Sequence, residues 1–332
     1  MLRVFLTHNT EDLNAYYRDA RGSLEQIVEV VLNPFERDLS TPELIEAAAE
    51  CEVIVAHRST PGEAGLFDGS PNLLAFLRAA VDLSTVDVEA ASRAGVAVGQ
   101  AEKTFVAATA EMALALMLDV GRHVSRSTVE YRFGHTPPQR VGTQLRGSTV
   151  GIIGYGAIGS YLAEALAHLG MTILVTDPHV EVESRSARQV TLAQLLAESD
   201  FVVPLAISSA ETLHLIGPEQ IAAMKPGAIL VNVSRGELID EGAVEQALEA
   251  GHLGGFGMDV GSAADQRPSP RLAARPDVVA TPHLGGLTPA AAFGQAANTV
   301  EQVEAIVAGE LPPRIVNAES ATRLQAYLAG ER

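Results

Sequence analysis

The feature that most constrains the fold of this chain is a glycine-rich turn between an apolar run and a helical pattern. Val150-Gly151-Ile152-Ile153 is apolar throughout, as in a buried parallel strand, and runs directly into Gly154-Tyr155-Gly156-Ala157-Ile158-Gly159. Apolar residues then recur at helical spacing, at Ile158, Leu162, Ala165, Leu166 and Leu169. The pattern predicts a strand, a tight turn and a helix in direct succession, as in a doubly wound sheet.

Each glycine of this turn has its own expected role. Gly154 permits the tight turn, Gly156 lets the backbone approach a pyrophosphate, and Gly159 lets the helix pack against the strand. The helix N-terminus adds N–H groups and a partial positive charge that attract the anion. A glycine-rich turn without a ligand is the alternative, and the residues that follow argue against it.

An acidic residue lies where a ribose-binding group is expected. The next predicted strand, residues 172–176, ends at Asp177, about twenty residues beyond the glycines. A carboxylate there accepts hydrogen bonds from ribose hydroxyls and repels a 2′-phosphate, so the pattern predicts NAD rather than NADP. The alternative for Asp177 is a turn residue before Pro178.

Apolar runs alternate with helical patterns along the whole chain. Ser40-Thr41-Pro42-Glu43 is a typical helix start. Because 332 residues suit two domains better than one core, the alternation predicts two α/β domains with doubly wound parallel sheets. The remaining predicted strands cover residues 2–6, 27–32, 53–56, 73–77, 96–98, 201–204, 228–233, 255–258 and 278–280.

Charge and cysteine content narrow the expected partners. The formal net charge of -18 repels nucleic-acid phosphate and anionic lipid, so we expect neither nucleic acid nor a membrane as a partner. Cys51 is the only cysteine, which excludes an intrachain disulfide and a cysteine-based zinc cluster, and we expect no metal. A single cysteine fits a reducing compartment, and the apolar run at 2–6 is too short for a secretory signal, so the expected location is cytoplasmic.

Two further segments end predicted strands with side chains suited to acid–base chemistry. Arg235 follows the strand at 228–233 and His283 follows the strand at 278–280, where ligands bind in such sheets. Arginine binds a carboxylate through two parallel hydrogen bonds, and histidine exchanges a proton near neutral pH. Taken singly, Arg235 could form a surface ion pair and His283 could be structural.

Together these segments resemble the D-isomer-specific 2-hydroxyacid dehydrogenase family. The resemblance covers nearly the whole chain, including His57-Arg58-Ser59 and Met258-Asp259-Val260. It implies an NAD-dependent oxidoreductase in which the nicotinamide exchanges a hydride with C2 of a small 2-hydroxy or 2-keto acid. Arg235 would bind the substrate carboxylate and polarise the keto oxygen, and His283 would give that oxygen a proton or take it back.

The resemblance also implies further contacts. Ala157 and Ile158 would present N–H groups to the pyrophosphate, and Asp259 would lie near the nicotinamide carboxamide. The other expected residues are Ala206, Thr212 and Val233 along the cofactor cleft, and Ser59, Val81 and Asp82 where the substrate domain faces the nicotinamide.

The domain organisation follows from the same resemblance. A flavodoxin-like substrate domain would consist of residues 1–101 and 289–332, with a Rossmann cofactor domain, 102–288, inserted into it. Linkers near Ala101 and Thr288-Pro289 would act as hinges. Because the family is commonly dimeric, a homodimer with the helix at 104–121 and its surroundings in the interface is expected, and simple core packing of that helix is the alternative.

The chain departs from the family pattern beside the predicted histidine. The family glutamate that pairs with the histidine and raises its pKa falls at Ala264. Asp265, one residue later, is the candidate replacement in the catalytic set, and a loop acid that does not serve His283 is the alternative. In addition, Leu205 stands where the family has a histidine, which makes that wall of the cleft more apolar.

A second departure concerns the substrate. Asp82 lies in a turn that is often glycine-rich in the family, where a carboxylate would oppose an acid substrate unless Arg78 or Arg58 pairs with it. These departures leave open a catalytically weak NAD(H)-binding sensor or interaction protein, and a reductase for a cyclic or amine-bearing substrate. The retained Arg235 and His283 argue against the sensor.

Overall fold

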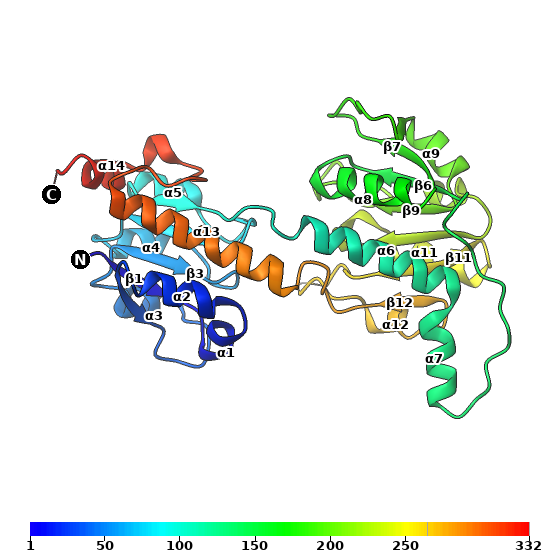
Figure 1. Cartoon of the computed structure of the whole chain (residues 1–332), viewed down its shortest axis with the longest axis horizontal. Coiled ribbons are helices and arrows are strands. Elements are labelled where there is room, and N and C mark those ends of the chain that lie inside the picture. The colour runs from blue at the N-terminus through cyan, green and yellow to red at the C-terminus, as the bar shows by residue number, and fades with distance from the viewer. Residues whose placement is uncertain (264, 332) are drawn as a thin grey trace. The chain divides into compact units, whose positions relative to one another are not determined.

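The computed structural model describes residues 1–263 and 265–331, which form two compact units. Unit 1 comprises Met1–Thr104 and Pro289–Arg332, and unit 2 comprises Phe105–Thr288. The chain thus leaves unit 1 once, builds unit 2 and returns (Figure 1). The sequence placed the first boundary near residue 101, and the packing places it after Thr104.

Unit 1 is built on a parallel sheet with the strand order β2-β1-β3-β4-β5. The order reverses between β1 and β3, which is the switch point of a flavodoxin-like sheet. Its strands are β1 (Arg3–Leu6), β2 (Glu29–Leu32), β3 (Val53–Ala56), β4 (Ala75–Arg78) and β5 (Ala97–Gly99). Its helices are α1 (Thr10–Asp12), a π-helical turn (Leu13–Tyr17), α2 (Arg18–Leu24), α3 (Thr41–Ala47), α4 (Ala64–Gly69), α5 (Val88–Arg93), α13 (Pro289–Ala308), a 3-10 turn (Ala318–Ser320) and α14 (Thr322–Leu328).

Unit 2 is built on a parallel sheet with the strand order β12-β11-β10-β9-β6-β7-β8. Its switch point lies between β6 and β9, as in a Rossmann fold. Its strands are β6 (Thr149–Ile153), β7 (Thr172–Thr176), β8 (Ala187–Gln189), β9 (Phe201–Pro204), β10 (Ala228–Asn232), β11 (Leu253–Met258) and β12 (Val278–Ala280). Its helices are α6 (Val106–Arg122), α7 (Val124–Arg132), α8 (Ala157–His168), α9 (Leu192–Glu198), α10 (Pro218–Ala222), a 3-10 turn (Gly236–Leu238), α11 (Glu241–Glu249) and α12 (Pro270–Ala273).

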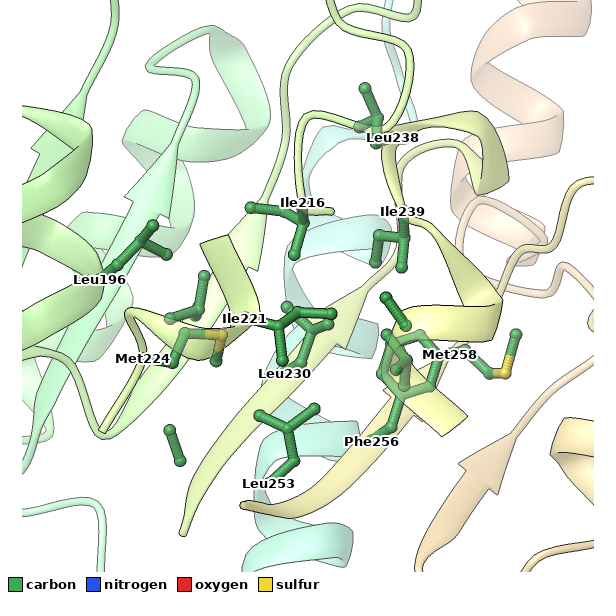
Figure 2. Packing of buried hydrophobic residues seen from close by; sticks show 14 of the residues in the cluster. Leu196, Ile216, Ile221, Met224, Leu230, Leu238, Ile239, Leu253, Phe256 and Met258 are labelled. Atoms are coloured by element: carbon green, nitrogen blue, oxygen red, sulfur yellow. The ribbon is translucent and has the colours of Figure 1, made fainter. Parts of the chain in front are cut away.

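Apolar clusters cover both faces of the unit 2 sheet. One cluster joins α6 and α8 to the sheet, and the other joins it to α9, α10 and α11. Figure 2 shows side chains of the second cluster, including Leu230 from β10 and Phe256 from β11. Burial of this kind stabilises the fold by about 25 cal/mol for each Å² of apolar surface removed from water. Two doubly wound α/β domains, expected from the sequence, are confirmed.

Besides the 3-10 turn at Gly236–Leu238, three short elements of unit 2 were not predicted. They are α7, β8 and α12, with nine, three and four residues, and each has few buried side chains. All nine residues of α7, which lie within the described part of the chain, are at least partly exposed. An element that faces solvent needs no apolar stripe, so its sequence carries little periodic signal. Among the described residues, none of the helices is both long and apolar enough to cross a membrane.

Candidate active site

The glycine-rich turn lies at the switch point of the unit 2 sheet. Gly154 has a φ of 103°, and a Cβ there would lie 2.8 Å from the backbone of Leu205 and Ala206. A Cβ on Gly159 would overlap the carbonyl oxygen of Gly154, so the first turn of α8 packs directly on the turn. A Cβ on Gly156 would meet nothing within 4 Å. The space beside Gly156 is therefore open, as its predicted approach to a pyrophosphate requires.

The start of α8 suits an anion as well. The helix begins at Ala157, its N-cap is Gly156, and no side chain caps it. Because the first N–H groups of a helix lack partners within the helix, Ala157 and Ile158 can present theirs to a ligand.

Asp177 joins the end of β7 to the glycine-rich turn. Its Oδ2 accepts a hydrogen bond from the N–H of Tyr155 at 2.7 Å, and its Oδ1 accepts from the N–H groups of His179 and Val180. Partial burial acts to raise the pKa of Asp177, but the three backbone donors outweigh it and hold the pKa below its ordinary value. A carboxylate offers about four acceptor positions, so an ionised Asp177 has room for a ribose hydroxyl.

Arg235 extends from the segment that follows β10. It is half-buried, with extended backbone, and its Nη1 donates to the carbonyl oxygen of Ser234 at 2.8 Å. A Cβ on the next residue, Gly236, would overlap the backbone of Gly261 and Ser262. This close approach brings the Arg235 segment against the segment that follows β11.

His283 lies in a loop that follows β12 and is shaped by Asp259. The carboxylate of Asp259 is fully buried and accepts hydrogen bonds from Thr281 Oγ1 at 2.6 Å, Leu284 N at 2.8 Å and Gly285 N at 2.7 Å. The N–H of His283 donates to the carbonyl oxygen of Asp259 at 2.8 Å. His283 has a φ of 59°, in the left-handed region, and its side chain is exposed. The network therefore holds an unfavourable backbone conformation that presents an imidazole.

The order of the strands brings Arg235 and His283 to the same edge of the unit 2 sheet. β10, β11 and β12 are adjacent and parallel, so Arg235, Asp259 and His283 all follow the carboxyl ends of neighbouring strands. A guanidinium there suits a carboxylate, and an exposed imidazole suits proton exchange. The predicted approach of Asp259 to a carboxamide remains a prediction, because its carboxylate is used within the 281–285 loop.

Asp265 is engaged with a neighbour in its own loop. Its carboxylate is 59% exposed, lies 3.6 Å from Nε of Arg267 and accepts a hydrogen bond from the N–H of Arg267. The predicted pairing of Asp265 with His283 remains a prediction. Ala264, where the family has glutamate, lies outside the described residues.

Of the remaining cofactor residues, Ala206 lies close to the glycine-rich turn. The N–H of Ala206 faces Gly154, and the carbonyl oxygen of Ala206 accepts a hydrogen bond from Ser234 Oγ at 3.1 Å. Val233 is buried directly after β10. Thr212 lies farther along the loop after β9 and donates from its Oγ1 to the carbonyl oxygen of Ile207 at 2.6 Å.

The predicted substrate residues of unit 1 lie in loops after β3 and β4. Ser59 Oγ is 2.7 Å from His57 Nδ1, and Val81 is partly exposed. Asp82 accepts hydrogen bonds from Ser84 N at 2.9 Å and Ser84 Oγ at 3.0 Å.

Arg78 is one of the two arginines that the sequence suggested as a partner of Asp82. The side chain of Arg78 is buried and donates to the carbonyl oxygens of Arg58 and Thr60. Burial lowers the pKa of Arg78, while the nearby negative charge of Asp82 raises it. Of the two predicted partners, Arg78 is the one whose pKa the charge of Asp82 acts to raise, against the larger lowering effect of burial.

Two buried polar residues near the ends of strands were not identified from the sequence. Asn232 is the last residue of β10 and is buried, and its side-chain amide is hydrogen-bonded to the backbone of Ser234 and of Arg235. His8 follows β1, is 3% exposed, and its ring lies 5.1 Å from that of His57. Each stands at or just after the end of an apolar strand, and that position is the signal that could have identified them.

A doubly wound sheet with a glycine-rich turn at its switch point and an acid after the next strand defines the class of dinucleotide-dependent enzymes. The family model described as "D-isomer specific 2-hydroxyacid dehydrogenase, NAD binding domain" matches residues 114–285. The chain belongs to this family. It is an NAD-dependent dehydrogenase, as the sequence predicted, and NAD is its cofactor.

Similar proteins support the same family. The glyoxylate reductase of Thermococcus onnurineus is 33% identical over 310 residues, which cover 89% of this chain and 92% of that one. The D-3-phosphoglycerate dehydrogenase of Mycobacterium tuberculosis is 35% identical over 280 residues, 82% of this chain and 52% of the relative, so the match spans about half of that protein. The solved structure of the TT0316 protein from Thermus thermophilus has a TM-score of 0.83 at 30% identity, covering 95% of this chain and 100% of that one.

Proposed function

We propose that this chain reduces a small 2-keto acid, or oxidises the corresponding 2-hydroxy acid, with Arg235 and His283 as its two reacting side chains. The observation that carries the proposal is that they follow β10 and β12, two strands of the sheet that holds the NAD-binding turn, at the same edge of that sheet. NAD(H), when bound, supplies or accepts the hydride at C2 of the substrate.

Arg235 binds and orients the acid. Its guanidinium offers two parallel donors to the substrate carboxylate and polarises the keto oxygen. This local positive charge also offsets the repulsion that a chain with a net charge of -18 exerts on an anion.

His283 moves the proton. Its imidazole donates a proton to the substrate oxygen during reduction and takes the proton back during oxidation. The Asp259 network supports this role, because it fixes the backbone of His283 while the side chain stays exposed. Asp265 is the proposed carboxylate partner of the ring. Asp265→Asn is then expected to lower turnover and move the pH profile to lower pH.

The proposed substrate is a short 2-keto acid. Similar proteins from Thermococcus onnurineus, Thermococcus gammatolerans and Pyrococcus furiosus are named glyoxylate reductase, and each match covers more than nine tenths of the relative. Ser59, Val81 and Asp82 are the proposed substrate residues of unit 1. The electrostatic interaction of Arg78 with Asp82 supports this assignment, since a positive charge near Asp82 would offset the repulsion between Asp82 and an acid.

The test is NADH oxidation with glyoxylate, pyruvate and hydroxypyruvate. We expect turnover on at least one of these acids, and a loss of kcat/KM of about 100-fold or more in both Arg235→Gln and His283→Gln, with NADH affinity retained. Arg21, a partly exposed arginine on α2 that is not among the proposed site residues, provides the matched control Arg21→Gln. Tight NADH binding without turnover on any acid would favour the sensor instead.

We also propose that two copies form a homodimer in the cytoplasm. All residues of α7 are at least partly exposed, and apolar side chains are prominent on α7 and just beyond it, with Tyr131 64% and Phe133 77% exposed. Exposed apolar surface of this kind is typical of an interface between protein copies. The single cysteine, buried and free, supports the compartment.

A further inference from the structure

We propose that Asn232 is a positioning residue for the reaction, connecting the backbone of Arg235 to the loop that carries His283. The inference rests on the proposed roles of Arg235 and His283 and adds a residue that acts through them. It is drawn entirely from contacts within unit 2.

The first part of the connection is the amide of Asn232. The residue ends β10 and is 1% exposed. Its Oδ1 accepts a hydrogen bond from the N–H of Ser234 at 3.0 Å, and its Nδ2 donates to the carbonyl oxygen of Arg235 at 2.8 Å. One buried amide thus fixes the residue before Arg235 and the backbone of Arg235 itself.

The guanidinium depends on the same turn. Arg235 Nη1 donates to the carbonyl oxygen of Ser234, the residue whose N–H Asn232 holds. Ser234 Oγ in turn donates to the carbonyl oxygen of Ala206, beside the glycine-rich turn. Loss of the Asn232 amide would therefore free both the backbone and the side-chain support of Arg235.

The second part of the connection runs to His283. The carbonyl oxygen of Asn232 accepts a hydrogen bond from the N–H of Asp259 at 2.9 Å. The buried Asp259 carboxylate and carbonyl then bind the loop at Thr281, His283, Leu284 and Gly285. The side chain of Asn232 thus bonds to Arg235, and its backbone carbonyl bonds to Asp259, which in turn bonds to His283.

An amide is required at this position because it must donate and accept at once. In Asn232→Asp the shape is kept, but an oxygen replaces the donor and faces the carbonyl oxygen of Arg235. A buried carboxylate opposite a carbonyl is repelled, so the Arg235 segment must move. A displacement of about 1 Å at a reacting group can lower a rate about 100-fold.

Unit 1 supplies a matched control. Asn33 directly follows β2, is 9% exposed, accepts from the N–H of Phe35 at 2.9 Å and donates to the carbonyl oxygens of Thr7 and Arg37, each at 3.0 Å. Asn33→Asp removes the same kind of buried donor. It separates a general loss of stability from a loss of positioning.

The experiment compares both variants with the wild type in NADH-dependent reduction of glyoxylate, NADH affinity, thermal unfolding and backbone amide exchange. We expect Asn232→Asp to lower kcat about 10- to 100-fold, to change the Kd of NADH by less than about twofold, and to speed exchange at Ser234 and Leu238, whose N–H groups donate to the Asn232 side chain and to the carbonyl oxygen of Arg235. Asn33→Asp should lower Tm comparably and leave kcat per folded molecule unchanged. An unchanged kcat in Asn232→Asp, or an equal loss in Asn33→Asp, would overturn the inference.

The experiment also provides for a variant that does not fold and for a wild type without turnover. If Asn232→Asp does not fold, Asn232→Ser, which is neutral but too short to reach the Arg235 carbonyl, takes its place with the same expectations. If the wild type turns over no keto acid, the proposed function fails, and amide exchange alone decides the inference. Unchanged exchange at Ser234 and Leu238 would then show that the Asn232 side chain does not hold the Arg235 segment.

Discussion

At the scale of single residues, the cofactor-binding turn depends on two glycines for different reasons. Gly154 is required by the fold, because its φ is 103° and neighbouring backbone lies 2.8 Å from a Cβ position. Gly156 has open space at its Cβ position, so its lack of a side chain serves the ligand instead. Substitution by alanine should therefore affect stability at Gly154 and cofactor binding at Gly156.

We expect Gly154→Ala to lower the free energy of unfolding by about 1–3 kcal/mol, from backbone strain and overlap. Gly156→Ala should leave the free energy of unfolding nearly unchanged and weaken NADH binding, because its methyl group occupies that open space. Chemical denaturation and NADH fluorescence titration measure the two effects. Equal loss of stability in both variants would contradict the assignment.

A second residue-scale effect comes from His8. Burial, with a smaller contribution from the charge of His57, lowers the pKa of His8 to about 3. An unfolded histidine titrates near about 6.5, so between these values the unfolded chain binds more protons than the folded one. The stability due to neutral His8 is therefore complete above a pH of about 6.5 and is lost as the pH falls toward about 3.

We expect His8→Gln to flatten the dependence of unfolding free energy on pH in this window. The wild-type slope from this residue is at most about 1.4 kcal/mol per pH unit, rising with pH. Urea unfolding at pH 4, 5, 6 and 7 measures it. His168→Gln, at an exposed position on α8, should keep the wild-type slope, and an unaltered slope in His8→Gln would refute the explanation.

At the scale of elements, α6 and α7 differ although one follows the other. α6 packs tightly on β11, where a Cβ on Gly257 would lie 2.9 Å from Leu116 Cβ. α7 extends beyond the end of α6 and is followed by an extended segment (Figure 1). The core of unit 2 thus accounts for the buried apolar residues of α6, and the exposed apolar residues around α7 form the surface that the proposed dimer would bury.

We expect the double variant Tyr131→Glu and Phe133→Asp to convert the proposed dimer to a monomer without lowering Tm by more than a few degrees, because neither side chain belongs to the core. Light scattering coupled to size-exclusion chromatography measures the mass. The exposed Tyr161→Glu on α8 is the control. A wild-type monomer, or a variant that stays dimeric, would rule out this interface.

At the scale of the whole molecule, the cofactor is expected to stabilise one unit selectively. All proposed NAD-binding residues lie in unit 2, within Phe105–Thr288. A ligand at about a hundred times its Kd adds about 2.7 kcal/mol to the stability of the part that binds it.

We therefore expect saturating NADH to slow amide exchange in β6, β9 and β10 much more than in β1 and β3. Hydrogen exchange on the full chain, with and without NADH, measures this difference. Equal protection of both units would show that the two unfold as one cooperative body.

Much of this arrangement was accessible from the sequence because it depends on neighbours along the chain. The capping pair at the start of α3 is one example, since Ser40 N donates to Glu43 Oε2 at 2.9 Å within a single turn. The glycine-rich turn and Asp177 are another, because strand, turn, helix and strand follow one another directly. Apolar runs identified nearly every strand, since parallel strands are buried on both faces.

Contacts between distant residues were decided by tertiary structure. Asp259 binds a loop 22 to 26 residues away, and Arg78 gains its partners from a loop about twenty residues earlier, distances at which periodicity carries no information. The sequence by itself determined the fold class, the cofactor turn and the two candidate reacting residues. Only the order of β10, β11 and β12 decided that Arg235 and His283 share one edge and that Asn232 and Asp259 connect them, because strand order depends on packing between residues far apart in the chain.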